Sequence, residues 1–198
     1  MQKEDKKKIP APVLRRLPIY QHYLRGLQEQ QVITVSCTQI AKDLKLTSIQ
    51  IRKDLAMTGI VGKPKVGYIV EDLLVKIEKF LGWQQSAEAF VVGVGHLGTA
   101  LLGYDGFTKM GLHIIAGFDN DTNKIGSEIY GKKIFAINRL SELVSRMNIH
   151  IGVITVPAKY AQEIADIMVK SGIKAIWNFA DIRLSVPDGV IVQHENLA

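Results

Sequence analysis

The sequence lacks residues on which several classes of protein depend. Its single cysteine, Cys37, excludes an intramolecular disulfide framework and a cysteine-rich zinc site. No apolar run reaches the roughly 18 residues that a membrane-spanning helix needs. The first eight residues are polar, and no apolar segment of the kind found in secretory signals follows them. We therefore expect a cytoplasmic protein that is not attached to a membrane.

Positive charge is concentrated in the first part of the chain. Residues 1–85 carry 15 Lys or Arg against 8 Asp or Glu, whereas residues 86–198 carry 10 against 11. The net charge of all 198 residues is +6. A basic first half joined to a nearly neutral second half suggests that one part binds a polyanion and the other does not. The alternative is that the basic surface only keeps the protein in solution.

Two short helices joined by a tight turn are predicted in the basic half. Ser36 and Thr47 each stand where the N-cap of a helix is expected, with Gln39 and Gln50 three residues later. This pattern is a capping box, and it predicts helices that run through Leu44 and to about residue 57. Such a pair is typical of a helix-turn-helix.

Further elements are expected on either side of this pair. Apolar residues recur at helical spacing from 13 to 29, and we expect that helix to begin near Pro18, with the proline in its first turn. Glycines and lysines between 59 and 70 predict a small hairpin with a basic tip, the wing of a winged helix. A further helix is expected over 71–80.

These elements predict a surface that binds DNA. The second helix of a helix-turn-helix enters the major groove, where Gln and Arg side chains can pair bidentately with adenine and guanine. Lysines on the wing suit phosphates or the minor groove. For any one of these residues the alternative is an ordinary solvated side chain. The residues that we expect to contact DNA are Ser48, Gln50, Arg52 and Lys53 on the helix, and Lys63, Lys65 and Tyr68 on the wing.

The second half alternates apolar strands with helices. This alternation predicts a parallel sheet that is covered on both faces. The fold class is therefore α/β, with a winged helix-turn-helix domain (1–82) followed by a Rossmann-like parallel-sheet domain (83–198). The strands are expected at 89–94, 112–118, 133–136, 149–156, 175–179 and 190–192, and the helices from about 99 and over 157–170.

A G-x-G-x-x-G motif leaves the first of these strands. Its first glycine makes the tight turn, the second lets the backbone approach a pyrophosphate, and the third lets helix pack on strand. Asp119 ends the next strand, 21 residues beyond Gly98, where a carboxylate accepts hydrogen bonds from an adenosine ribose and repels a 2′-phosphate. We therefore expect NADH or NAD⁺ rather than NADP(H), with Asp121 and Lys124 shaping the nearby loop or contacting the edge of the ribose. The motif comprises Gly93, Val94, Gly95, His96, Leu97 and Gly98.

The ends of two later strands are expected near the nicotinamide, because ligands lie outside the carboxyl ends of parallel strands. Ordinary strand-to-helix turns are the alternative at these positions. Roughly 110 residues remain for the nucleotide domain, which leaves no separate substrate domain, so we expect no catalytic turnover. The two segments are Thr155-Val156-Pro157 and Asn178-Phe179-Ala180.

Taken together, these segments resemble the Rex family of bacterial redox-sensing transcriptional repressors. The resemblance runs through nearly the whole chain and implies a homodimer on an inverted-repeat DNA operator, released when NADH binds. It also implies that Tyr104 closes the nicotinamide pocket and that Arg16 and Asn196 take part in an interdomain switch. The segments that carry it are Ile9-Pro10, Arg15 to Pro18, Ser48 to Asp54, Gly59, Gly62, Gly67-Tyr68, Gly93 to Gly98, Phe118-Asp119, Thr155 to Pro157 and Asn178 to Ala180.

The sequence departs from the family pattern in three places. Residues 56–61 differ from the usual end of the recognition helix, Asn196 replaces a usual Asp, and the family's swapped C-terminal helix is expected to be missing after Ala198. Two alternatives remain open. The protein could be a regulator of another nucleotide, because the segment after Thr155 also resembles CoA-binding Rossmann domains, or a small NAD-dependent oxidoreductase.

Overall fold

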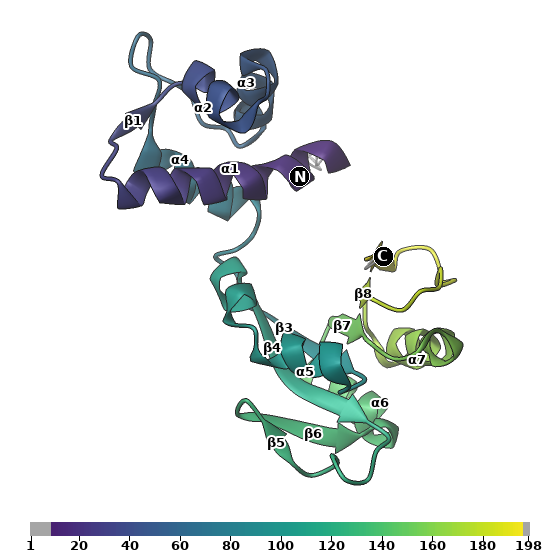
Figure 1. Cartoon of the computed structure of the whole chain (residues 1–198). Helices are drawn as coiled ribbons and strands as arrows, with labels where there is room; N and C mark the ends of the chain where they lie inside the picture. The colour runs from purple at the N-terminus through teal and green to yellow at the C-terminus, as the bar shows by residue number, and fades with distance from the viewer. Residues whose placement is uncertain (1–8, 196–198) are drawn as a thin grey trace. The chain divides into compact units, whose positions relative to one another are not determined.

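A computed structural model of the chain describes residues 9–195, which divide into two units between residues 84 and 85 (Figure 1). Each unit has a hydrophobic core of its own. The first unit is mainly helical. It is built from α1 (Ala11–Glu29), β1 (Thr34–Val35), α2 (Cys37–Leu44), α3 (Ser48–Met57), β2 (Tyr68–Ile69) and α4 (Val70–Phe80).

The helix-turn-helix forms where the capping residues predict it. The hydroxyl of Ser36 accepts a hydrogen bond from the backbone N–H of Gln39 at 3.1 Å, and that of Thr47 accepts one from Gln50 at 3.3 Å. Lys45 ends α2 in the left-handed conformation, with φ of 55°. α2 and α3 then pack together over Ile40, Ile51 and Leu55, which are fully buried against α1 and α4.

The start of α1 is a correction to the sequence prediction. The helix begins at Ala11 rather than near Pro18, and Pro18 lies in its interior. A proline there removes the N–H that would bond to the carbonyl of Leu14. Leu14 is 40% exposed, so water can replace that bond, while the side chains of Val13 and Leu17 are buried. Burial of the first two turns therefore outweighs the lost hydrogen bond.

The wing is also smaller than predicted. Its hairpin is reduced to one antiparallel bridge between Lys63 and Gly67. β2 pairs instead with β1, a strand that was not expected. Gly67 makes this possible, because a Cβ there would lie only 2.4 Å from the carbonyl oxygen of Val35.

The second unit is a seven-stranded sheet in the order β5-β6-β4-β3-β7-β8-β9, parallel except for the β5–β6 pair at one edge. α6 and α7 cover one face, while α5 and η1 pack on the other. Its elements are β3 (Ala87–Val92), α5 (His96–Gly103), η1 (Asp105–Met110), β4 (Leu112–Asp119), β5 (Glu128–Ile129), β6 (Lys132–Ala136), η2 (Ile137–Arg139), α6 (Leu140–Met147), β7 (Ile151–Ile154), α7 (Ala158–Ser171), β8 (Ala175–Asn178) and β9 (Ile191–His194).

Several boundaries differ from those expected. β3 ends at Val92 rather than at 94, because Gly93 turns the chain with φ of 96°. α5 accordingly begins at His96, three residues early. α6 and the antiparallel β5 were not predicted. Among residues 9–195, no helix is both long and apolar enough to span a bilayer.

Candidate functional sites

The three glycines of the motif between the end of β3 and the first turn of α5 have three different steric environments. At Gly93, φ is 96° and a Cβ would lie 2.8 Å from Cγ1 of Val156. At Gly98, a Cβ would lie 1.9 Å from the carbonyl oxygen of Gly93, so strand and helix meet with no room for a side chain. Gly95 has nothing within 4 Å of its Cβ position. Gly93 therefore turns the chain, Gly98 lets α5 pack on the strand, and Gly95 leaves open space beside the backbone. Binding of a dinucleotide pyrophosphate requires this arrangement.

Neighbouring side chains hold this loop in place. The hydroxyl of Thr155 lies 2.6 Å from the carbonyl oxygen of Gly93 and 3.1 Å from that of Val92, and serves as the donor to them. The backbone N–H of Val94 donates to Asp119 at 2.7 Å. Val94 and Gly98 are buried, whereas His96 is exposed and Leu97 half-buried in the first turn of α5. The open glycine thus lies in a loop whose shape is fixed from both sides.

Asp119 lies at the carboxyl end of β4 beside a lysine. Lys124 Nζ lies 3.5 Å from the Asp119 carboxylate and 3.7 Å from that of Asp121. Partial burial of Asp119 favours its neutral form. The backbone N–H groups of Asp121 and Val94, together with the charge of Lys124, outweigh this and lower its pKa below the usual value. Asp119 is therefore ionised at neutral pH and can accept hydrogen bonds from a ribose.

A cleft of about 530 Å³ opens beside these residues, within the size range of ligand pockets. Seven predicted residues line it: Gly93, Gly95, Asp119, Lys124, Thr155, Val156 and Pro157. The sequence did not indicate several of its other walls, which include Ile137 and Asn138 after β6 and Tyr160, Glu163, Ile164 and Ile167 on α7. The spacing of the α7 residues puts them on one helix face, the signal that could have identified them.

The segment after β8, which is predicted near the nicotinamide, does not line this cleft. The Asn178 side chain is fully buried, and its amide donates to the carbonyl oxygens of Ala180 at 3.1 Å and Ile182 at 2.9 Å. Its oxygen accepts from the N–H of Ala180. Asn178 therefore shapes this turn and does not line the cleft, because every polar atom it has is used within the protein. Phe179 and Ala180 do not line the cleft either.

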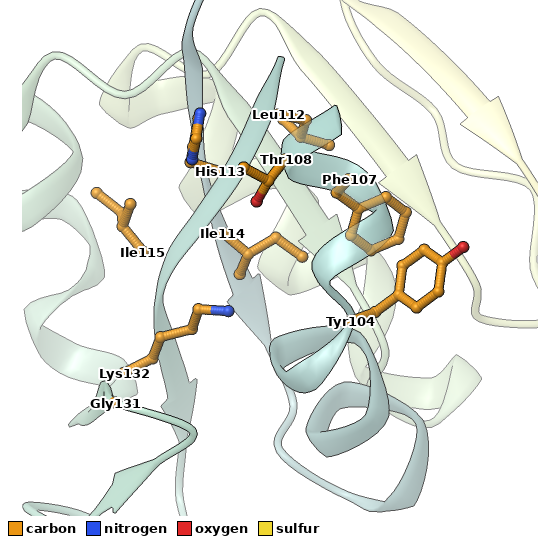
Figure 2. A pocket seen from close by; sticks show the side chains of 9 residues that line it. All are labelled: Tyr104, Phe107, Thr108, Leu112, His113, Ile114, Ile115, Gly131 and Lys132. Carbon is orange, nitrogen blue, oxygen red and sulfur yellow. The ribbon is translucent and has the colours of Figure 1, made fainter. Parts of the chain in front are cut away.

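Tyr104 lies at the end of a row of aromatic rings. The ring centroids of Tyr104 and Phe107 are 4.8 Å apart. Those of Phe107 and Trp177 are 5.3 Å apart, and those of Trp177 and Phe179 are 4.8 Å apart. Tyr104 is 55% exposed and lines a separate pocket of about 280 Å³ with Phe107, Ile114 and Lys132. Figure 2 shows its hydroxyl turned away from Lys132. Tyr104 and Phe179 thus belong to one row, outside the cleft.

The exposed face of α3 carries Arg52 and Lys53, as predicted for contact with DNA. Ile49 is 64% exposed and shares this face by its helical spacing, although the sequence analysis did not single it out. Ser48 and Gln50 are half-buried at the edge of the face. An exposed isoleucine between basic side chains can contact a thymine methyl group.

On the wing, Lys63 and Lys65 are exposed, and Lys65 is at the tip with φ of 62°. Tyr68 is half-buried. Its hydroxyl is 3.9 Å from the Cys37 sulfur. Its ring packs against Gly62, where a Cβ atom would lie only 2.9 Å from Cζ of the ring. Burial and the adjacent Cys37 raise the pKa of Tyr68. Tyr68 therefore joins the wing to the start of α2.

The predicted switch residues are only partly described. Arg16 forms a bidentate ion pair with the buried Asp54, inside the first unit. Asn196 lies outside the described residues. A role for either residue in interdomain switching stays a prediction.

Comparison with known proteins identifies both units. The family described as "CoA binding domain" matches residues 84–182, and "Putative DNA-binding protein N-terminus" matches residues 8–56. A redox-sensing transcriptional repressor Rex from Treponema denticola is 52% identical over 98% of this chain and 92% of the relative. Its counterpart from Carboxydothermus hydrogenoformans is 45% identical over 96% and 91%.

Solved structures agree with these relatives. RSP, a Rex-family repressor, in complex with NAD⁺ and operator DNA has a TM-score of 0.93 and 35% identity, covering 97% of this chain and 88% of that one. The same repressor in complex with NADH has a TM-score of 0.89 and 34% identity, covering 97% and 90%. The α/β fold class, with a DNA-binding first part and a Rossmann-like second part, is thereby confirmed. The chain belongs to the Rex family of redox-sensing transcriptional repressors.

Proposed function

We propose that this protein is a transcriptional repressor that binds operator DNA through α3 and the wing and leaves it when NADH occupies the cleft. The steric pattern of the glycine loop carries this proposal, because Gly95 alone leaves open space at the phosphate position while Gly93 and Gly98 cannot accept a side chain. The relatives are repressors, which supports a regulatory role without catalytic turnover.

The cleft supports a specific placement of the dinucleotide. The pyrophosphate lies over Gly95 at the N-terminus of α5, where backbone N–H groups without helical acceptors favour an anion. Asp119 binds the adenosine ribose, and Val156 and Pro157 contact the middle of the ligand. Tyr160, Ile164 and Ile167 then form an apolar wall for the adenine ring.

Release of DNA needs a difference in NADH affinity between two states. If NADH lowers DNA affinity a hundredfold, DNA must lower NADH affinity by the same factor. The uncharged nicotinamide of NADH suits an apolar environment in which the cationic ring of NAD⁺ is disfavoured. We propose that two copies of the chain act on an inverted repeat in the cytoplasm, since a two-fold dimer matches a two-fold site.

The test uses DNA first selected by the protein from a random duplex pool. Fluorescence anisotropy of that duplex is then followed while NADH, NAD⁺ or CoA is added. We expect NADH to release the DNA at concentrations where NAD⁺ does not.

The match to the CoA binding domain family makes CoA the second candidate ligand. Release by CoA but not by NADH would replace the proposal with that alternative. Steady consumption of NADH with carbonyl substrates would instead indicate an oxidoreductase.

A further inference from the structure

A partly buried ion pair joins α1 to the predicted recognition helix. Arg16 Nε donates to Asp54 Oδ2 at 2.7 Å, and its Nη2 donates to Oδ1 at 2.9 Å. The hydroxyl of Tyr20 donates to the same carboxylate at 2.7 Å. Asp54 is only 3% exposed, so the guanidinium is held in one orientation by a carboxylate that cannot move into solvent.

The same guanidinium contacts Gln50, one turn before Asp54 on α3. With the amide oxygen toward Arg16, Gln50 Oε1 lies 3.1 Å from both Nη1 and Nε, and it accepts from Nη1, which makes no hydrogen bond to Asp54. The opposite orientation would set the amide NH₂ against a group that has only donors. The amide of Gln50 is therefore fixed with its oxygen inward and its NH₂ away from Arg16.

We infer that Arg16 is a positioning residue that makes Gln50 a donor-only reader of DNA bases. This inference rests on the proposed binding of α3 to DNA. A free glutamine pairs bidentately with adenine, using its oxygen for the N6 amino group and its NH₂ for N7. Gln50 has its oxygen engaged, so it selects base edges that present acceptors, namely guanine O6 and N7 or thymine O4. It disfavours cytosine, whose major-groove group is an amino donor.

The experiment measures base preference at one position of the selected duplex. The position read by Gln50 is the one whose preference is lost in Gln50→Ala, found with a panel of single base-pair variants. For the wild type, we expect guanine or thymine to be favoured over cytosine there by about tenfold, within the range for a good base contact. Adenine should have no advantage over guanine.

Two variants then test Arg16 itself. Lys at position 16 keeps a positive charge for Asp54 but has no planar fork to reach Gln50 as well. Arg16→Lys should release the amide, so that adenine gains about tenfold relative to guanine. Arg15→Lys, at the exposed neighbouring position on α1, is the matched control and should leave all base ratios unchanged.

Gln50→Glu provides a second route that leaves the Arg16–Asp54 pair intact. Its carboxylate keeps Arg16 as partner and has a free oxygen that accepts from the cytosine amino group, so the preference should move to cytosine. This shift confirms that residue 50 contacts the base, and if Arg16→Lys fails to fold, the wild-type ratio of adenine to guanine at the same position decides the outcome, because a free glutamine favours adenine.

The possible results separate the inference from the function on which it rests. Weaker binding of Arg16→Lys to all sequences with unchanged base ratios would show a merely structural role and overturn the inference. A wild-type preference for adenine over guanine at the Gln50 position would also overturn it. A wild type that selects no sequence from the pool would overturn the proposed function and the inference together.

Discussion

Gly95 and Gly98 lie three residues apart, at the N-cap and in the first turn of α5, yet alanine should affect different properties at the two positions. At Gly95, φ is −79° and no atom lies within 4 Å of the Cβ position, so the protein itself can accept the methyl group. At Gly98, the methyl carbon would lie 1.9 Å from the carbonyl oxygen of Gly93. Only Gly95→Ala should therefore weaken ligand binding without destabilising the folded protein.

The expected magnitudes follow from these distances. Gly95→Ala gains about 0.4–1 kcal/mol from a less flexible unfolded chain and loses about as much at the N-cap, where alanine is poor. The unfolding temperature should therefore stay within about 4 °C of the wild type. Its methyl group occupies the pyrophosphate position, where overpacking of about 1–3 kcal/mol weakens NADH binding by roughly 5–150-fold. Gly98→Ala must move backbone atoms, so we expect a loss of about 3 kcal/mol or more in stability.

Thermal unfolding and isothermal titration with NADH, run on both variants and the wild type, measure these two effects. Gly95→Ala should unfold normally and bind NADH poorly, whereas Gly98→Ala should unfold about 10 °C lower or more. Wild-type NADH affinity in Gly95→Ala would refute the placement of the pyrophosphate. A Gly98→Ala variant as stable as the wild type would refute the packing argument.

Three further predictions concern other parts of the molecule. The pKa of Asp119 is lowered in the folded protein, so its contribution to stability is present above its unfolded pKa of about 4 and lost as the pH falls through the folded value. The difference in unfolding temperature between the wild type and Asp119→Asn should therefore shrink from pH 7 to pH 3. A difference that stays constant with pH would contradict this. Ile49→Ala should weaken DNA binding about fivefold, and replacing thymine by uracil in the duplex should cause a similar loss. The two changes together should weaken binding no more than either one alone, because both remove the same contact. Losses that add would show that Ile49 does not contact the thymine methyl group. Asn178→Ala leaves buried groups of Ala180 and Ile182 unpaired, so urea unfolding should show a loss of about 3 kcal/mol, and a loss below about 1 kcal/mol would mean that water replaces the amide.

The features that the sequence predicted well are those set by a few adjacent residues. Ser36 and Thr47 cap their helices because the interaction is local, and Gly93 turns the chain because few other residues adopt its conformation. The glycine spacing also predicted the loop with its open centre at Gly95. These signals need no knowledge of the rest of the fold.

The features that the sequence missed depend on contacts between distant residues. Pro18 predicts a helix start by local rules, but the burial of Val13 and Leu17 extends α1 back to Ala11. Asn178 is typical of a ligand-binding turn, and only the fold shows that its amide is used within the protein. Likewise, no spacing rule places Arg16 on α1 against Asp54, 38 residues later.

The central claim is tested most directly by NADH release of operator DNA in the wild type and in Gly95→Ala, measured side by side. With the wild type, NADH should release the labelled duplex at concentrations near the dissociation constant of NADH, whereas NAD⁺ at the same concentrations should not. Gly95→Ala should bind the duplex normally and keep it as NADH is added over that range. Equal release of both proteins by NADH, or release by NADH and NAD⁺ alike, would contradict the account.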